Sequence, residues 1–141
     1  MCNLLQKAME IALEAHKGQV DKGGHDYILH PLRVACNCNS DDERIVAVLH
    51  DTIEDTDVTY DYLKKLDFPE YIIEAINSVT RRDGESYMDY IRRAKLNKLG
   101  REVKLRDLED NMNLNRIKNS TEKDYNRLKK YQKAKKILEE D

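Results

Sequence analysis

The 141-residue sequence predicts an all-α fold, a single domain of seven to eight helices. Apolar residues recur at helical spacing along most of the chain, and no long segment alternates as a strand would. Only 5 Gly and 2 Pro are present, which disfavours a many-turned β architecture. Hydrophobic residues make up 40% of the chain, and no internal repeat or Gly/Pro/Ser-rich linker divides it, so one core over residues 1–141 is expected.

The first expected helix carries apolar residues on one face and ends near Gly18. These apolar residues are Leu4, Leu5, Ala8, Ile11, Ala12 and Ala15. A loop with the turn signal Gly23-Gly24 follows. Pro31 is then expected at the first position of a second helix, because the missing N–H of proline costs nothing there. His30 would lie at the mouth of that helix.

The third expected helix is the most apolar and has the character of a buried central helix. Ser40 and Glu43 form a capping box at its start, and an unbroken apolar run covers residues 45–49. The end of this helix delivers His50 and Asp51.

Five further helices account for the rest of the chain. Their expected start signals are Thr59, Pro69, Ser86 with Asp89, a break at Gly100, and Thr121. The last segment, 120–141, is expected to be an amphipathic helix with a solvated, lysine-rich face. That face contains Lys129, Lys130, Lys133, Lys135 and Lys136.

Charge and cysteine content narrow the class of protein. The formal net charge is −2, so no basic surface is indicated for nucleic acid or for an anionic membrane. No segment approaches the ~20 apolar residues of a membrane helix, and the first ten residues do not resemble a secretory signal. Cys2, Cys36 and Cys38 suit neither a disulfide framework nor a zinc ribbon. Free thiols and a cytoplasmic location are expected.

The most informative segment places His50, Asp51, Glu54 and Asp55 directly after the apolar central helix. Burying these charges without compensation would cost several kcal/mol per ion, so a cation is expected to offset them. A solvated helix end is the alternative. Imidazole nitrogen and carboxylate oxygen are both ligands for divalent metals.

Two distant residues complete a candidate ligand set of two nitrogens and two oxygens. They are His30, before the second helix, and Asp107, on a later one. The resulting pattern, His30, then His50-Asp51, then Asp107, resembles the HD-domain metallohydrolases, in which H…HD…D binds one divalent ion. The surrounding segments, in order, are similar to motifs of the Rel/SpoT hydrolase domain. These segments are 15–19, 27–35, 50–56, 79–80 and 103–111, within a motif region of about 4–115.

Within that family the chain resembles the small alarmone hydrolases, including the metazoan SpoT homologues, which carry only the hydrolase domain. Its 141 residues are expected to leave no space for a synthetase domain. The resemblance implies an HD-domain helical bundle and an enzyme of the stringent response, a guanosine-3′,5′-bis(diphosphate) 3′-diphosphatase. Such an enzyme releases pyrophosphate from (p)ppGpp and leaves GDP or GTP. One Mn²⁺ per chain is the expected cofactor, with other divalent ions as alternatives.

Roles for individual side chains follow from the same resemblance. Glu54 and Asp55 match the catalytic pair that activates water and passes its proton, one turn after Asp51. Four residues are expected to hold the nucleotide substrate, namely Lys22, Tyr27, Lys104 and Asn111.

Four positions depart from the family pattern and leave the substrate open. Asp21 and Asp26 stand where arginine and proline are common, Arg106 replaces a small residue, and Asp110 replaces a histidine. One alternative is therefore an HD phosphohydrolase for another nucleotide, such as a ppApp-type alarmone or NADPH. The other is a non-catalytic nucleotide-binding or antitoxin-like module. The native metal, protein partners and oligomeric state stay open.

Overall fold

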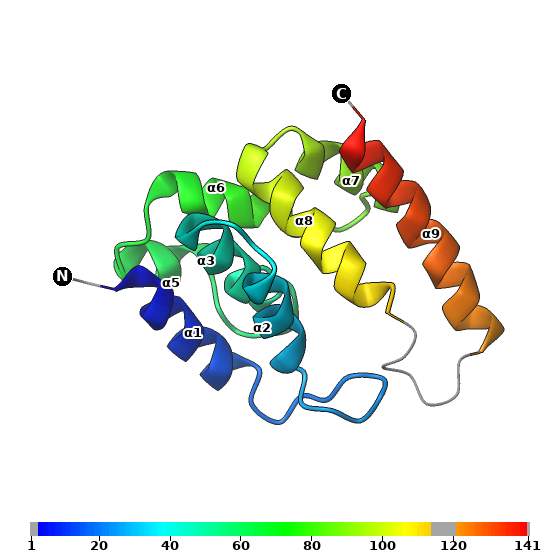
Figure 1. Ribbon diagram of the computed structural model, residues 1–141. Helices are drawn as coiled ribbons and strands as arrows, with labels where there is room; N and C mark the ends of the chain where they lie inside the picture. Colours follow the sequence, from blue (N-terminus) through cyan, green and yellow to red (C-terminus); the bar gives the residue numbers. More distant parts are fainter. Residues whose placement is uncertain (1–2, 114–120, 141) are drawn as a thin grey trace.

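The computed structural model describes residues 3–113 and 121–140, and its regular secondary structure is helical, as predicted (Figure 1). The helices are α1 (Leu4–Ala15), α2 (Leu29–Cys36), α3 (Asp41–Leu49), α4 (Thr52–Asp55), α5 (Tyr60–Lys65), α6 (Glu70–Ser78), α7 (Tyr87–Lys95), α8 (Lys98–Asn111) and α9 (Glu122–Glu139). The single turn α4 continues α3 after His50 and Asp51. Taken together as one helix, the two bring the count within these ranges to the expected eight.

Residues 1–2, 114–120 and 141 lie outside the described ranges, and so do Cys2 and the end of the motif region. The extent of the domain therefore stays a prediction. Cys36 is exposed, Cys38 is buried, and both are free thiols. No helix in the described ranges is long and apolar enough to cross a membrane.

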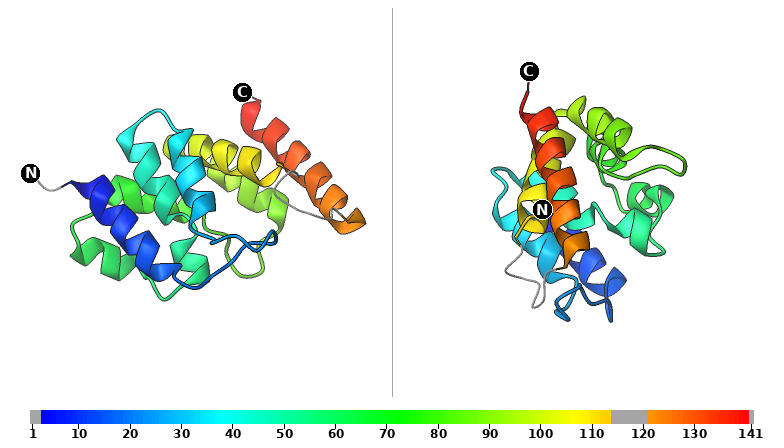
Figure 2. Two further views of the ribbon diagram at one scale, coloured as in Figure 1. Left: turned by 60° about the horizontal axis from the view of Figure 1, so that its bottom comes forward. Right: turned by 90° about the vertical axis from the view of Figure 1, so that its right-hand side faces the viewer.

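Helix α3 lies at the centre of one group of helices, packed against α1, α2, α6 and α8. Helix α8 also packs against α7 and α9, so it passes between the two halves of the molecule (Figures 1 and 2). The first hydrophobic cluster includes Ala8, Val34, Val46, Leu49, Ile72, Ile76 and Val103. The second cluster consists of Tyr90, Ile91, Leu105, Leu108, Ala134 and Leu138. Helix α8 contributes to both clusters and joins them.

The predicted helix starts are confirmed where a side chain caps the helix. The hydroxyl oxygen of Ser40 accepts from the backbone N–H of Glu43 at 3.2 Å, and that of Ser86 accepts from Asp89 at 3.1 Å. Thr59 caps α5 in the same way, and Thr121 forms a capping box at the start of α9. Each cap satisfies a backbone donor that the first helical turn leaves without a partner.

The start of α2 differs from the prediction. The helix begins at Leu29, so Pro31 is its third residue and not its first. Proline is tolerated there because N–H groups of the first turn have no acceptor within the helix. His30 consequently lies inside the first turn, where it is buried.

The sequence suggested a break at Gly100 before the next helix. In the structure, Gly100 lies within α8 instead. The helix begins after Asn97, whose side chain accepts from the N–H of Gly100 at 2.9 Å. A Cβ atom added to Gly100 would lie 1.9 Å from Oγ of Ser78 in α6. The glycine is therefore needed for the close approach of α8 to α6.

Candidate metal centre and adjoining cavity

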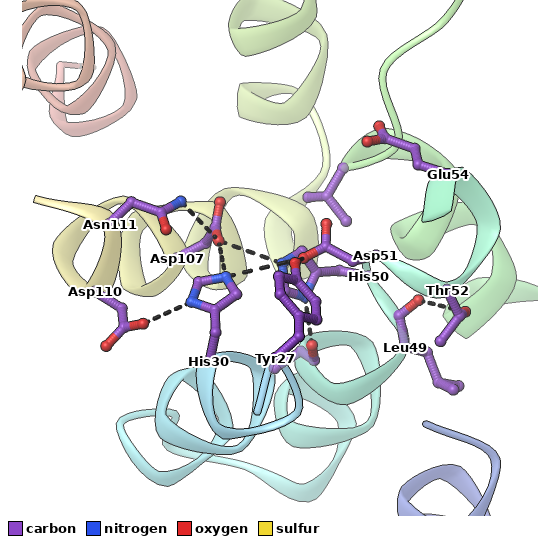
Figure 3. Close-up of polar contacts among 12 residues, drawn as sticks. Tyr27, His30, Leu49, His50, Asp51, Thr52, Glu54, Asp107, Asp110 and Asn111 are labelled. Atoms are coloured by element: carbon purple, nitrogen blue, oxygen red, sulfur yellow. Dashed lines mark hydrogen bonds and ion pairs between the residues drawn. The ribbon is translucent and has the colours of Figure 1, made fainter. Parts of the chain in front are cut away.

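Three side chains from distant parts of the sequence meet at one point (Figure 3). His30 lies in the first turn of α2, His50 at the end of α3, and Asp107 in α8, and all three are buried. Oδ1 of Asp107 lies 2.8 Å from Nε2 of His30 and 3.3 Å from Nε2 of His50. Each residue offers one donor atom, and these atoms all lie within 4.8 Å of one another. This is a geometry in which a single cation can be held.

Asp51 lies at the edge of this group. Its Oδ2 is 3.0 Å from Nε2 of His50 and 3.9 Å from Nε2 of His30. Asp51 nevertheless does not belong to the group whose donor atoms all lie within 4.8 Å of one another. The hydroxyl of Tyr27 donates to the same oxygen of Asp51. Tyr27, expected to touch the substrate, therefore also contacts a predicted metal ligand.

Both imidazole rings are oriented by a bond at their outer nitrogen. Nδ1 of His50 bonds to the backbone carbonyl of Ala47, and Nδ1 of His30 lies 2.6 Å from Oδ2 of Asp110. Nε2 of each ring consequently faces Asp107. Histidine ligands in metal sites are commonly held in this way.

The charges at the centre are strongly coupled. Burial would lower the pKa of His50, but the neighbouring charges of Asp51 and Asp107 raise it well above its usual range. Burial would raise the pKa of Asp51, but the charge of His50 lowers it to about 2. For Asp107, burial is outweighed by Lys104 and the two histidines, which hold its pKa well below its ordinary value.

Ionised carboxylates beside imidazole nitrogens form a mixed oxygen and nitrogen donor set, which suits a borderline divalent cation. The residues present therefore fit a divalent metal.

Two of the residues predicted to bind substrate contact Asp107 directly. Nζ of Lys104 donates to Oδ2 of Asp107 at 2.7 Å, and Nδ2 of Asn111 donates to Oδ1 at 3.3 Å. Lys104 is buried, and its ammonium group lies 5.0 Å from the ring centroid of Tyr90. Burial would lower the pKa of Lys104, but Asp107 raises it, so the lysine is positively charged.

A cavity of about 610 Å³ opens onto the centre. Small-molecule sites typically have volumes of roughly 300–1,000 Å³, so the cavity suits a nucleotide. The residues predicted from the sequence that line it are Lys22, Tyr27, His30, Asp51, Glu54, Lys104, Asp107 and Asn111. Nζ of Lys22, one of these lining residues, lies 3.9 Å from Oδ1 of Asp124 in α9. All four predicted substrate residues thus reach one cavity.

The two residues of the expected catalytic pair are both exposed, but only one of them lines the cavity. Glu54 lines the cavity, and its carboxylate accepts from the backbone N–H of Arg81. Burial and the charge of Asp51 raise the pKa of Glu54, although the Arg81 bond opposes this. Asp55 does not line the cavity, and partial burial together with the charge of Asp51 raises its pKa too.

The far wall of the cavity contains residues that the sequence analysis did not assign to the site. Arg127, Lys130 and Tyr131 come from α9, and Tyr87 comes from α7. Nζ of Lys130 lies 4.4 Å from the ring centroid of Tyr87. Lys130 is exposed, as expected, but it also faces the cavity.

A signal for this wall was present in the sequence of α9. Arg127 and Tyr131 continue at helical spacing into the buried residues Ala134 and Leu138, so all four share one face.

An all-helical domain whose central helix ends in His-Asp, beside a second histidine and a distant aspartate, has the architecture of the HD-domain metal-binding proteins. No family model matches the chain. A guanosine-3′,5′-bis(diphosphate) 3′-pyrophosphohydrolase of Aquifex aeolicus is 43% identical over 81 residues, covering 55% of this chain. The bifunctional (p)ppGpp synthase/hydrolase SpoT of Escherichia coli K12 is 37% identical over 89 residues, covering 60% of this chain. The matched region is 12% of each of these relatives.

A solved structure has the same fold over nearly the whole chain. It is a metazoan ortholog of SpoT, described as hydrolysing ppGpp, with a TM-score of 0.78 and 20% identity. The match covers 99% of this chain and 87% of the other. The predicted helical HD-domain fold and the resemblance to the Rel/SpoT hydrolases are thereby confirmed.

Proposed function

We propose that this protein is a divalent-metal-dependent (p)ppGpp 3′-pyrophosphohydrolase, which releases pyrophosphate and leaves GDP or GTP. The observation that carries the proposal is the meeting of His30, His50 and Asp107 beside a cavity that five cationic side chains help to line. The names of the curated relatives and of the structural neighbour support the choice of substrate.

The metal would be held by His30, His50, Asp51 and Asp107, and we propose Mn²⁺ as the native ion. Support comes from the donor set, two imidazole nitrogens with carboxylate oxygens beside them. A divalent cation bound there lowers the pKa of water and offsets charge on a phosphoryl oxygen.

The reaction requires water to add to the phosphorus next to the ribose 3′ oxygen, with cleavage of the bond between them. Glu54 is the proposed acceptor of the proton from water, since it lines the cavity and its pKa is raised. The Arg81 amide holds one carboxylate oxygen of Glu54. Asp55, which is exposed, is proposed to pass protons between Glu54 and solvent. The leaving 3′ oxygen takes up a proton in turn.

Substrate phosphates would be held by the cationic side chains of the cavity, which form charge-assisted hydrogen bonds. These side chains are Lys22, Arg81, Lys104, Arg127 and Lys130. Asn111 and Tyr27 are proposed to contact the nucleotide beside the metal ligands. The cavity thus supplies local positive charge in a chain whose net charge is −2.

A second candidate function is hydrolysis of another nucleotide, such as ppApp or NADPH, in the same cavity. The observation that favours it is Asp21, at a position where relatives commonly carry arginine. Oδ1 of Asp21 accepts from the N–H groups of Gly23 at 2.8 Å and His25 at 3.0 Å. This carboxylate shapes the loop and supplies no cation for a purine or a phosphate.

The proposal is tested by incubating the purified chain with Mn²⁺ and ppGpp, ppApp or NADPH in separate reactions, and measuring release of pyrophosphate and phosphate. Pyrophosphate and GDP are expected from ppGpp. Asp51→Ala should abolish turnover because it removes a charged side chain from the metal centre. Asp41→Ala, which removes an exposed carboxylate of α3, is the matched control and should retain activity.

Other outcomes would each overturn a defined part of the proposal. Turnover of NADPH or ppApp alone would replace the substrate. Tight binding of ppGpp with no turnover under any divalent ion would favour a non-catalytic module. Full activity of Asp51→Ala would remove Asp51 from the ligand set.

A further inference from the structure

We propose that Asp110 is a positioning residue for the metal centre: it holds the outer nitrogen of His30, so that Nε2 of this ring is aimed at the cation. Arg33 in turn fixes Asp110. The inference rests on the proposed function, because it concerns the same site, and it assigns a role to a position where the sequence departs from the pattern of the family that it resembles.

The three side chains form a continuous series of bonds between α2 and α8. Oδ2 of Asp110 lies 2.6 Å from Nδ1 of His30 (Figure 3). Nε of Arg33 donates to Oδ1 of Asp110 at 2.8 Å, and its Nη2 donates to Oδ2 at 3.2 Å. The Asp110 side chain is 7% exposed, and Asp110 is not among the residues that line the cavity. Its role is therefore to act on His30 and not on the substrate.

The chemistry of this contact selects one tautomer of the ring. A carboxylate only accepts hydrogen bonds, so Asp110 favours the form of His30 with its proton on Nδ1. In that form the lone pair of Nε2 is available to a cation, which would replace the 2.8 Å contact between Nε2 of His30 and Oδ1 of Asp107. The opposite tautomer would place a proton on Nε2, where a metal must bind.

The two histidine rings are held by acceptors of different kinds, so the contact at His30 can be changed without changing the contact at His50. Nδ1 of His50 bonds to the backbone carbonyl of Ala47, an acceptor that no side-chain substitution removes. His30 depends instead on a side chain. The orientation of the His30 ring thus depends on the Asp110 side chain. Asp110 can be substituted while all the proposed metal ligands stay in place.

Arg33 makes the arrangement stable. It follows His30 by three residues on α2, so both side chains lie on the same face of the helix. Its planar guanidinium contacts both oxygens of Asp110, which restricts rotation of the carboxylate and offsets its buried charge.

The test compares wild type with Asp110→Asn, which preserves size but removes the charge of the acceptor. Glu109→Gln is the matched control, since it neutralises the adjacent carboxylate, which pairs with Arg106 at the surface. Co²⁺ and Zn²⁺ are titrated into ion-free protein, and the ring nitrogens of the Zn²⁺-loaded protein are assigned by ¹H–¹⁵N NMR. Circular dichroism verifies folding of each variant.

We expect Asp110→Asn to weaken metal binding by about 10- to 100-fold, and Glu109→Gln to bind as wild type. Wild type should show a proton on Nδ1 of His30, and this signal should broaden or vanish in Asp110→Asn. Arg33→Lys, which retains the charge but not the two-point contact, should weaken binding by less. This second variant keeps the test decisive if Asp110→Asn does not fold.

Two kinds of failure are distinguishable. If wild type binds no divalent ion, the proposed function itself fails. If wild type binds the ion but Asp110→Asn binds equally well with an unchanged Nδ1 signal, the role of Asp110 is overturned while the metal centre stands. Ligation through Nδ1 of His30 would also overturn it.

Discussion

Four predicted site residues share Asp107 as a partner. Its carboxylate contacts His30, His50, Lys104 and Asn111. The sequence motifs suggested separate roles for these residues, two as metal ligands and two as substrate contacts. Their shared partner shows that the predicted metal and substrate regions form one network, in which Lys104 and Asn111 also fix the carboxylate of Asp107.

Glu54→Gln is expected to slow turnover while leaving the metal affinity unchanged. Glutamine keeps an oxygen that can accept from the Arg81 amide, but it cannot take a proton from water. Loss of a general base typically costs ~10²- to 10⁴-fold in rate, so kcat should fall in this range. Steady-state kinetics and a Mn²⁺ titration check the prediction.

Glu74→Gln, at an exposed position on α6, is the control for this experiment and should have wild-type kinetics. A wild-type kcat for Glu54→Gln would assign Glu54 to capping of the segment at Arg81 and exclude it as a base.

The residues of the candidate site differ in how clearly a sequence motif indicated them. His30, His50 and Asp107 stand in distinctive sequence contexts, and the structure brings them together. The far wall was missed because the position of Lys130 beside Tyr87 depends on how α9 packs against α7 and α8. Asp110 was taken to affect nucleotide fit, since its partner His30 is distant in the sequence.

Helix boundaries were predicted correctly where their cause lies nearby in the sequence, and not where it lies in another helix. Starts set by hydrogen bonds within three residues, as at Ser40 and Ser86, were predicted correctly. Gly100 was misinterpreted because its reason lies in another helix, at Ser78 of α6. Helix periodicity thus indicates that an element exists, but close approach between elements depends on the assembled fold.

Gly100→Ala is therefore expected to destabilise the protein, although alanine is the better helix former by about 1 kcal/mol. The new Cβ would lie 1.9 Å from Oγ of Ser78, which is held by a bond to the carbonyl of Ala75. Overpacking of this kind typically costs ~1–3 kcal/mol. Urea unfolding gives the free energy.

Ser78→Ala removes the obstructing hydroxyl and provides the control background. In that background Gly100→Ala should cost less than in wild type, so the two substitutions should not be additive. Additive effects, or a stabilised Gly100→Ala, would mean that α8 can shift away from α6 without cost.

At the scale of the whole molecule, the candidate metal centre lies where α2, α3 and α8 meet, against the first hydrophobic cluster. A ligand that binds the folded chain and not the unfolded one stabilises the fold by mass action. Because the candidate ligands come from three separate helices, a bound cation would cross-link the fold.

Mn²⁺ is accordingly expected to raise the unfolding temperature. Free ion at about 100 times its Kd contributes about 2.7 kcal/mol. For a chain of this size, that corresponds to an increase of roughly 5–10 °C, measurable by calorimetry with and without a chelator. The increase should be lost or much reduced in Asp51→Ala and retained in Asp41→Ala. An equal increase in Asp51→Ala would place the stabilising ion elsewhere.

The residues that line the cavity belong to helices that pack in different hydrophobic clusters. The candidate metal ligands belong to helices of the first cluster or to their ends, whereas Arg127, Lys130 and Tyr131 project from α9, which packs in the second cluster. Substitutions on α9 can thus change this part of the cavity lining without replacing any candidate metal ligand. Related proteins with this fold could therefore differ in the molecule that the cavity admits while keeping the same candidate metal ligands.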